Sequence, residues 1–236
     1  MAAALVTGGA LRLGRAIATG LARQGFDIAL HYNRSTNAAD ETVAAIKKLG
    51  VQCTGFSCDF NKLSCLPDFL KTVKTTHEDL ELLINSASLF LPENIENTPD
   101  DILVKTMNIN LMTPFVLMRE FKKRVSKGQI INITDQRILR HGHSYSAYAV
   151  SKAALSHLTV LGAVEFGPEV RVNAIAPGLI LPDVNKNDVE FFKKRAKSIP
   201  LRKNGSTDAI LLGVEYLLKN DFVTGETLFI DGGESK

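Results

Sequence analysis

The sequence predicts an α/β fold with a doubly wound parallel sheet of seven strands and helices on both faces. Short β-rich runs alternate with helical patterns along the chain, and a glycine-rich turn follows the first run. The 236 residues are 45% hydrophobic, which is enough apolar material for one sizeable core. We therefore expect a single domain that spans residues 1–236.

The first half of the chain alternates strand and helix from its start. Residues 3–6 are a small apolar run that ends at Thr7-Gly8-Gly9, and residues 13–23 carry small and apolar side chains on one helical face. A helix over 36–49 is ended by Gly50. The expected strands of this half are 3–6, 26–31, 52–57 and 80–84, and its expected helices are 13–23, 36–49 and 63–76.

The second half continues the pattern with longer helices. The run QIINI at 129–133 is a buried strand, and a helix over 145–166 is stopped by Gly167-Pro168. The remaining expected elements are helices over 99–124 and 207–218 and strands over 170–175 and 227–230. Right-handed crossovers then place helices on both faces, and ligands bind where the strands end at their carboxyl edge.

A glycine-rich segment, Thr7-Gly8-Gly9-Ala10-Leu11-Arg12-Leu13-Gly14, joins the first strand to the first helix. Glycines allow a tight turn and close approach of the backbone to a pyrophosphate, and the free N–H groups of a helix start favour anions. Gly8, Leu13 and Gly14 are therefore expected cofactor contacts in a Rossmann-type fold. Such loops also occur for turn geometry alone, so the motif gains weight from its place after an N-terminal strand.

The end of the second strand indicates which dinucleotide binds. NAD enzymes place an acid about 20 residues beyond the loop to bind the ribose 2′-OH, but this strand runs into His31-Tyr32-Asn33-Arg34-Ser35. Arg34 offers a planar fork for a phosphate, Ser35 adds a hydroxyl, and Arg12 supplies a second positive charge. We therefore predict NADPH; the alternative is that Arg34 is an ordinary solvated side chain.

Tyr148 and Lys152 lie four residues apart in the expected helix 145–166, which places them on one face. An ammonium group near a phenol favours the phenolate, so this arrangement predicts a Tyr148 pKa lowered toward neutrality. Such a tyrosine suits proton transfer coupled to hydride transfer.

The motifs together resemble the short-chain dehydrogenase/reductase family over nearly the whole chain. The resemblance rests on TGGALRLG, NSAS, NINL, YAVSK, RVNAIAPG and TGETLFIDGG. It implies an NAD(P)-binding sheet of seven strands, usually in a tetramer, with Tyr148 as the acid/base and Lys152 holding the nicotinamide ribose. It further implies that Asn110 supports a water relay and that Asp59 contacts adenine. The other implied cofactor contacts are Asn85, Ser86, Ala87, Pro177 and Gly178.

Asp135 departs from the usual pattern of that family. Most relatives have a serine about thirteen residues before the tyrosine, whose hydroxyl donates to a substrate carbonyl; QIINITDQ places Asp135 there. An ionised carboxylate has no proton to donate and would repel a developing alkoxide. We expect the hydroxyl of Thr134 to point to the other face of the strand. A substrate whose C=N bond is reduced needs a proton on nitrogen, which an acid near Tyr148 can help to supply.

Further departures resemble the pteridine reductase branch of the family. Ser88 replaces the usual glycine of that segment, and Phe90 can stack on a flat heterocycle. In that branch the arginine matching Arg12 contacts phosphate, and the serine, the phenylalanine and a tyrosine matching Tyr145 line the pterin pocket. The expected substrate contacts are therefore Ser88, Phe90, Asp135, Tyr145 and Tyr148. Carried over, the activity is NADPH-dependent reduction of a dihydropterin to the tetrahydro form, with dihydrofolate and biopterin as further candidate substrates.

Two other functions remain open from the sequence. A carbonyl reductase, such as a 3-oxoacyl-carrier-protein reductase, would share the cofactor site but is disfavoured by Asp135 and Phe90. A non-catalytic NADP sensor is disfavoured because Asn110, Tyr148 and Lys152 are all retained.

Composition bounds the partners. A net charge of +3 gives no nucleic-acid footprint, and we expect no apolar run long enough for a membrane span. Three cysteines without a zinc or disulfide pattern predict reduced thiols and a cytoplasmic protein. His141 and His143 lack a third ligand, so no metal is expected. Residues 179–202 are expected to form a substrate lid, and apolar residues on several faces of helix 145–166 favour a homotetramer.

Overall fold

The computed structural model describes residues 1–140, 142, 144–182 and 189–236. Its centre is one sheet of seven parallel strands in the order β3-β2-β1-β4-β5-β6-β7, which confirms the predicted fold class. The strands are β1 (Ala3–Val6), β2 (Asp27–Tyr32), β3 (Cys53–Ser57), β4 (Leu80–Asn85), β5 (Gly128–Ile133), β6 (Val170–Pro177) and β7 (Thr227–Ile230).

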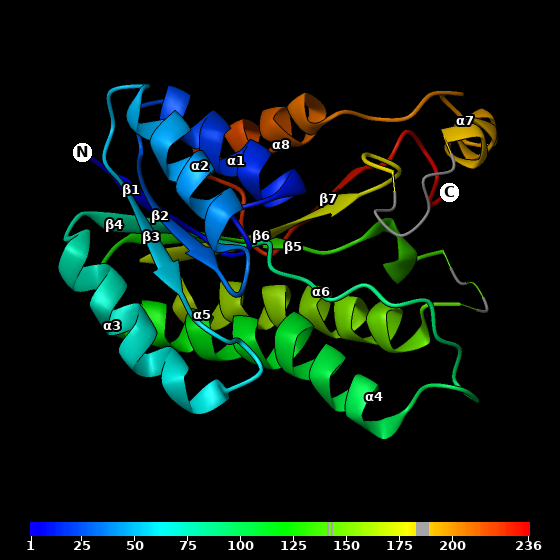
Figure 1. Ribbon diagram of the computed structural model, residues 1–236, viewed down its shortest axis with the longest axis horizontal. Helices are drawn as coiled ribbons and strands as arrows, with labels where there is room; N and C mark the ends of the chain where they lie inside the picture. Colours follow the sequence, from blue (N-terminus) through cyan, green and yellow to red (C-terminus); the bar gives the residue numbers. More distant parts are fainter. Residues whose placement is uncertain (141, 143, 183–188) are drawn as a thin grey trace.

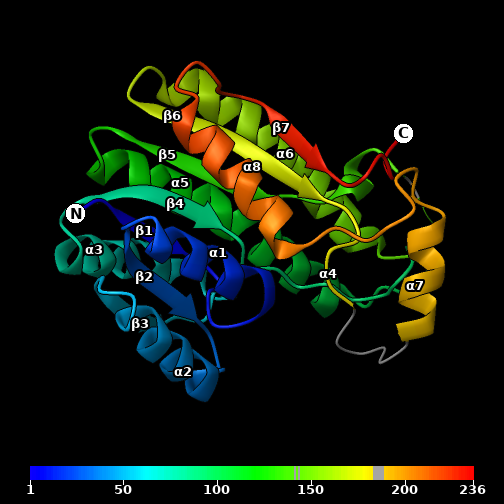
Figure 2. The ribbon, with the colours of Figure 1, turned by 90° about the horizontal axis from the view of Figure 1, so that it is seen from above.

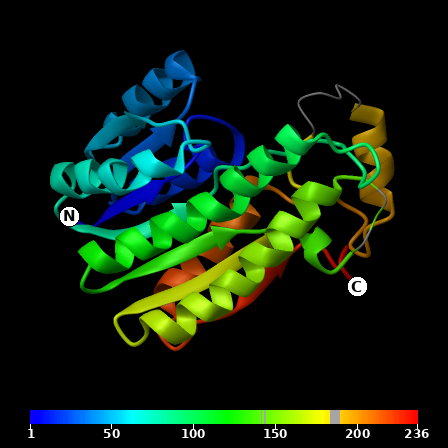
Figure 3. The same cartoon turned by 90° about the horizontal axis from the view of Figure 1, so that it is seen from below.

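Helices cover both faces of the sheet (Figure 1). Figure 2 shows α1, α2 and α8 on one face, and Figure 3 shows α3, α4, α5 and α6 on the other. The helices are α1 (Arg12–Arg23), α2 (Thr36–Lys47), α3 (Leu66–Thr76), α4 (Asp100–Met107), α5 (Thr113–Arg124), α6 (Ser146–Phe166), α7 (Val189–Lys197) and α8 (Thr207–Lys219). Short 3-10 turns are η1 (Leu63–Cys65) and η3 (Gln136–Ile138).

The sheet separates two apolar cores. Side chains of β1 alternate between them: Ala4 and Val6 pack toward α1 and α8, whereas Leu5 packs toward α3 and α5. The central strands are buried on both faces, as expected of parallel strands under two helical layers. This double burial explains why their sequences are nearly continuous apolar runs.

The predicted helix over 99–124 is wrong in one respect, because it is three segments. Helix α4 passes into a π-helical segment, η2 (Asn108–Met112), and then into α5, whose first turn contains Pro114. Proline lacks an N–H donor, so it breaks the regular ladder here. The wider turn places Asn110 in the interior, where it is fully buried.

Helix α6 is long and apolar enough to cross a membrane by length and composition alone, contrary to expectation. The core explains part of that composition, because Leu155 and Ala163 are buried where α6 packs against the rest of the domain. Other apolar side chains of α6, such as Val150 and Val164, are exposed.

The described residues between β6 and α8 lie beyond the carboxyl ends of the strands. Helix α7, which the sequence did not predict, stands at this end of the sheet (Figure 2). Its Ala196 packs with Leu179 and Ile199 in a small cluster separate from both cores.

Candidate active site

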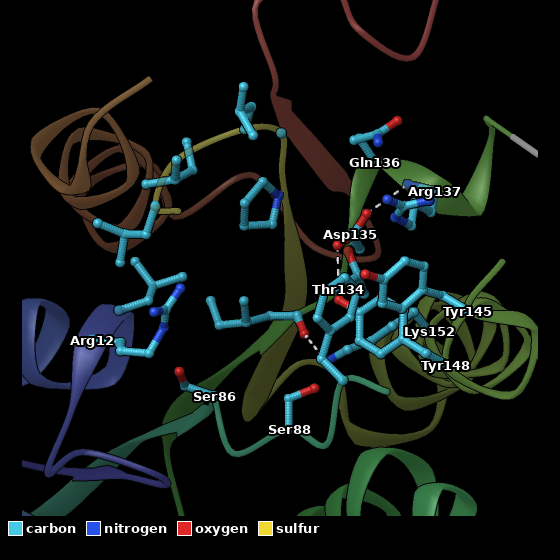
Figure 4. Close-up of a pocket in the computed structure, with 18 of the residues that line it drawn as sticks. Arg12, Ser86, Ser88, Thr134, Asp135, Gln136, Arg137, Tyr145, Tyr148 and Lys152 are labelled. Carbon is cyan, nitrogen blue, oxygen red and sulfur yellow. Dashed lines mark hydrogen bonds between the residues drawn. The ribbon is translucent and has the colours of Figure 1, made fainter. Parts of the chain in front are cut away.

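A cavity of about 760 Å³ opens at the carboxyl ends of the central strands. That volume is typical of ligand pockets. Figure 4 shows Arg12 and Ser86 on the side of the cavity opposite Asp135, Tyr145 and Tyr148. Fourteen of the predicted site residues line it: Gly8, Arg12, Leu13, Gly14, Ser86, Ala87, Ser88, Phe90, Asp135, Tyr145, Tyr148, Lys152, Pro177 and Gly178.

The glycine loop is built for a close approach of backbone to ligand. Gly8 has a φ of +64°, and a Cβ on Gly14 would lie 2.2 Å from the carbonyl oxygen of Gly8. Arg12 occupies a glycine position of the usual pattern and keeps its left-handed backbone, with a φ of +51°. Its guanidinium donates a 2.7 Å hydrogen bond to the carbonyl of Pro182 across the mouth of the cavity.

His31 is not among the predicted site residues, but it supports the glycine loop through a hydrogen bond. The Gly8 N–H donates to Nδ1 of His31 at 3.1 Å, so Nε2 carries the proton and donates to the Cys58 carbonyl at 3.0 Å. Burial lowers the pKa of His31 to about 4, which keeps the ring neutral. A histidine inside an apolar strand was the available signal.

The predicted 2′-phosphate segment lies outside the cavity. It follows the carboxyl end of β2, where Asn33 and Arg34 are exposed and Tyr32 and Ser35 are half-buried. Asp59, beyond the neighbouring strand β3, is also half-buried. These residues therefore form a second, open surface beside the glycine loop.

Asp135 and Tyr148 are directly bonded inside the cavity. The Tyr148 hydroxyl donates to Oδ2 of Asp135 at 2.7 Å, and the Arg137 N–H donates to Oδ1 at 2.8 Å. Asp135 thus caps η3 with one oxygen and holds the tyrosine with the other. The Thr134 hydroxyl donates to the carbonyl of Ile175, so it is not an alternative donor for a substrate.

Burial dominates the protonation of this pair. It raises the pKa of Asp135 above its ordinary value, although the Arg137 N–H opposes the shift. The expectation of a lowered Tyr148 pKa is wrong, because burial and the neighbouring Asp135 charge both raise it. Lys152 donates to the Ile133 carbonyl at 2.7 Å, and burial lowers its pKa to about 8. Burial therefore opposes the charged form of both Asp135 and Tyr148.

An aromatic stack forms one wall of the cavity. Phe90 stacks on Tyr145 with ring centres 4.1 Å apart, and it meets Tyr148 edge-on at 4.7 Å. The Arg137 guanidinium lies beside the stack, 4.9 Å from the ring centre of Tyr145 and 6.0 Å from that of Phe90. Tyr145 adopts a φ of +65° at the start of α6, a strained backbone that positions its ring.

Two predicted residues act behind the cavity wall. Asn110 accepts from the Leu89 N–H at 2.7 Å and donates to the Leu89 carbonyl and to Ser151. It also accepts from the Ser88 hydroxyl at 3.3 Å, so it fixes the loop that carries Ser88 and Phe90. Asn85 donates to Asn132 on the neighbouring strand and joins β4 to β5.

The described residues fit a dinucleotide. A glycine cradle that a Cβ would fill, an adjacent loop at Ser86 and Ala87, and the Lys152 ammonium are the groups that bind a pyrophosphate and a ribose. Among the described residues, no group of three or more His, Cys, Asp or Glu is placed to hold a metal. His141 and His143 lie outside the described residues.

Several lining residues were not predicted individually. Arg137 could have been found from its place two residues after Asp135. Phe192 and Arg195 lie on α7, and the sequence of α7 does not indicate which part of the fold this helix contacts. The unpredicted lining residues are Leu11, Ile133, Thr134, Gln136, Arg137, Gly142, Ser144, Leu179, Ile180, Leu181, Pro182, Phe192 and Arg195.

Known proteins share this chain's sequence and fold. The model of the Enoyl-(Acyl carrier protein) reductase family matches residues 9–235. Dihydromonapterin reductase from Citrobacter koseri is 34% identical, and the match covers 97% of this chain and 95% of the relative. FolM alternative dihydrofolate reductase 1 from Brucella suis, solved with NADP, is 30% identical with a TM-score of 0.94, covering 99% and 95% of the two chains. A blue fluorescent protein from a metagenomic library, solved with NADPH, is 28% identical with a TM-score of 0.91, covering 98% and 97%.

Proposed function

Because the chain belongs to the short-chain dehydrogenase/reductase family, we propose that its cavity binds NADPH and reduces a dihydropterin to the tetrahydro form. The observation that carries this proposal is the bonded pair of Asp135 and Tyr148 beside Phe90. A phenol and a carboxyl group joined by a hydrogen bond can relay a proton to a ring nitrogen that must gain one, and an aromatic face suits a flat heterocycle. The dihydropterin and dihydrofolate reductases among its relatives support the same substrate class.

NADPH supplies the hydride when it is bound. The glycine loop from Gly8 to Gly14 would hold its pyrophosphate, and Arg34, Ser35 and Arg12 would bind the 2′-phosphate. The Lys152 ammonium has three N–H donors, and one of them bonds to the Ile133 carbonyl. Another would orient the nicotinamide ribose.

Tyr148 and Asp135 would deliver the proton to the substrate. The Tyr148 hydroxyl points at Asp135 Oδ2, so a proton lost from the tyrosine can be replaced from the carboxyl at the other end of a 2.7 Å hydrogen bond. Burial raises the pKa of Asp135, which favours the binding of a proton by this carboxyl group. Ser88, Phe90 and Tyr145 would hold the heterocycle flat against the cofactor.

Residues 179–202 supply the substrate lid in this proposal. Both described parts of the segment reach the cavity, residues 179–182 through Leu179 to Pro182 and α7 through Phe192 and Arg195. The lid is part of the same domain, which spans residues 1–236.

The proposed assembly is a homotetramer that works in the cytoplasm without membrane or nucleic-acid partners. Exposed apolar side chains occur on α4, η2, α5 and α6, helices that lie on one face of the sheet (Figure 3), and together they make up the surface proposed for self-association. Its members are Leu103, Val104, Met112, Phe115, Val150, Val160, Leu161 and Val164. Clustered apolar side chains on helices favour packing against a second copy.

The test is NADPH oxidation by the purified protein with dihydromonapterin, dihydrobiopterin, dihydrofolate and an acetoacetyl thioester. We expect turnover of at least one pterin and little with the thioester. Fast thioester turnover without pterin activity would replace the proposal with a carbonyl reductase, and no oxidation with any of the four would leave a cofactor-binding sensor.

A further inference from the structure

Two of the three cysteines lie side by side next to the loop that follows β3. The sulfur atoms of Cys58 and Cys65 are 3.0 Å apart, about 1 Å longer than a disulfide bond. Cys58 follows β3, and Cys65 ends η1 and caps α3. The third cysteine, Cys53, packs in the core on the opposite face of the sheet. Only a small shift would be needed to bridge the close pair.

The chain gives the two sulfurs different chemical roles. Burial, followed by the neighbouring Cys65, raises the pKa of Cys58 to about 12, so this thiol is a poor first nucleophile. Cys65 lies at the start of α3, and its thiol donates to the Lys62 carbonyl at 3.0 Å. Attack on an oxidant is therefore expected from Cys65, and Cys58 is placed to resolve the product.

The pair is mechanically connected to the glycine loop. The carbonyl of Cys58 accepts the Nε2 proton of His31, and Nδ1 of His31 accepts the N–H of Gly8. The His31 ring also stacks on Phe60, with centres 3.6 Å apart, and Phe60 lies in the loop between the two cysteines. A shift of this loop therefore reaches Gly8 through two hydrogen bonds and Asp59 directly.

We propose that Cys58 and Cys65 form a reversible disulfide and that its formation weakens NADPH binding. The oxidant is a low-molecular-weight disulfide such as oxidised glutathione. The Cys65 thiolate attacks one of its sulfurs, which forms a mixed disulfide and releases one glutathione; Cys58 then attacks the Cys65 sulfur and releases the second. The two protein thiols are oxidised, the small disulfide is reduced, and their protons end on the released thiols. The effect on binding rests on the proposed position of the cofactor.

The experiment treats the full chain with oxidised glutathione and makes two independent measurements. Mass spectrometry of unreduced peptides should show the loss of two hydrogens and a link between Cys58 and Cys65. Titration with NADPH, followed by nicotinamide fluorescence, should show a Kd raised by about five- to tenfold, which is typical of coupled sites. Dithiothreitol should restore both readouts.

Three variants make the result specific. Cys53→Ala should behave as the parent does, because that cysteine lies across the sheet. Cys65→Ser and Cys58→Ala should each lose the bridge and the change in Kd, and Cys58→Ala should instead hold one glutathione on Cys65. No bridge in the parent, a bridge that contains Cys53, or a bridge with unchanged Kd would overturn the proposal. Failure of the reduced parent to bind NADPH would refute the proposed cofactor function, while the peptide map would still decide the disulfide.

Discussion

Tyr148 donates its hydroxyl proton to Asp135 over 2.7 Å, and Asp135 uses its other oxygen to cap η3 through the Arg137 N–H. The carboxyl group is thus fixed by the turn that follows β5, and the phenol is fixed by α6. Both side chains line the cavity, so each can contact a ligand that enters it. The pair is therefore organised to move a proton toward whatever occupies the cavity beside it.

Asp135→Asn should impair proton supply to the substrate without impairing cofactor binding. The amide keeps the size of the side chain and can still accept from Tyr148, but it cannot give up a proton as a carboxyl group does. We expect kcat with a dihydropterin to fall by about 10²- to 10⁴-fold, the usual contribution of general acid catalysis. The Kd for NADPH should change little.

The control for that change is Asp221→Asn, which alters an exposed carboxylate beyond α8. A second variant, Asp135→Ser, introduces the hydroxyl that the family resemblance leads us to expect at this position, and it should also lose pterin turnover. Parental pterin rates in either Asp135 variant would remove Asp135 from the mechanism.

The pH dependence of stability should report the buried carboxyl. The folded-state pKa of Asp135 is raised above its ordinary value of 3.8, so the folded state binds this proton more tightly than the unfolded chain does. The stabilising contribution is complete below the unfolded value and is lost as pH rises through the folded value. Asp135→Asn should therefore gain stability relative to the parent as pH rises, measured by urea unfolding across that range. A difference that is independent of pH would show that folding does not change the pKa of Asp135.

Arg34 should decide the preference for NADPH. Its guanidinium is exposed at the end of β2, where it can form a bidentate bond with a phosphate. Arg34→Ala should weaken NADPH binding by about 1.5–3 kcal/mol, or roughly ten- to a hundredfold, while the Kd for NADH stays the same. Arg23→Ala is the matched control, because Arg23 is at the end of α1 that lies away from the glycine loop. Equal losses for the two cofactors would mean that Arg34 does not contact the 2′-phosphate.

The sequence predicted the sheet because its signals were local. Each central strand is an apolar run that is buried on both faces. Gly8 and Gly14 indicate the turn that follows the first strand. The π-helical turn at Asn110 has a weaker signature, because the apolar pattern around it is that of an ordinary helix and only Pro114 indicates a break. The bonds that Asn110 makes to Leu89 and Ser151 depend on how these segments pack.

The protonation of Tyr148 could not be read from spacing alone. Lys152 lies on the same helical face, as predicted, but its ammonium donates to the Ile133 carbonyl. Burial depends on how α6 packs against the sheet, and it opposes charge on the phenol. The position of Arg195 at the cavity could not be predicted for the same reason, because it depends on where α7 packs.

The apolar surface over α4, η2, α5 and α6 should be the site of self-association. Val164 is 79% exposed on α6, so a charge there would be solvated in a monomer but would be desolvated in an interface. Val164→Lys should shift the expected tetramer to smaller species in light scattering without changing the Tm of the isolated fold by much. Phe222→Lys is the control, because Phe222 is exposed outside this surface. A parent protein that is already monomeric would contradict the proposed assembly.

Glu234 should control how tightly α7 is held over the cavity. Its side chain is fully buried, and its Oε1 accepts from Arg195 on α7 at 2.8 Å and from Arg140 after η3 at 3.0 Å. Glu234→Gln removes the charge and weakens both contacts, so Phe192 and Arg195 should be held less firmly at the cavity wall. We expect the KM for a dihydropterin to rise by about tenfold, as losing about 1.5 kcal/mol of charged hydrogen bonding implies.

The matched control for Glu234 is Glu120→Gln. Glu120 is also a buried carboxylate, held by Arg124, Lys123 and Arg119 on α5. The first two of these partners lower its pKa to about 2, so removing its charge should reduce the Tm. It lies outside the lining of the cavity, and the KM should therefore stay at the parental value. If both variants raised KM equally, the effect would be a general loss of stability, and the ion pair between Glu234 and Arg195 would have no specific part in holding α7.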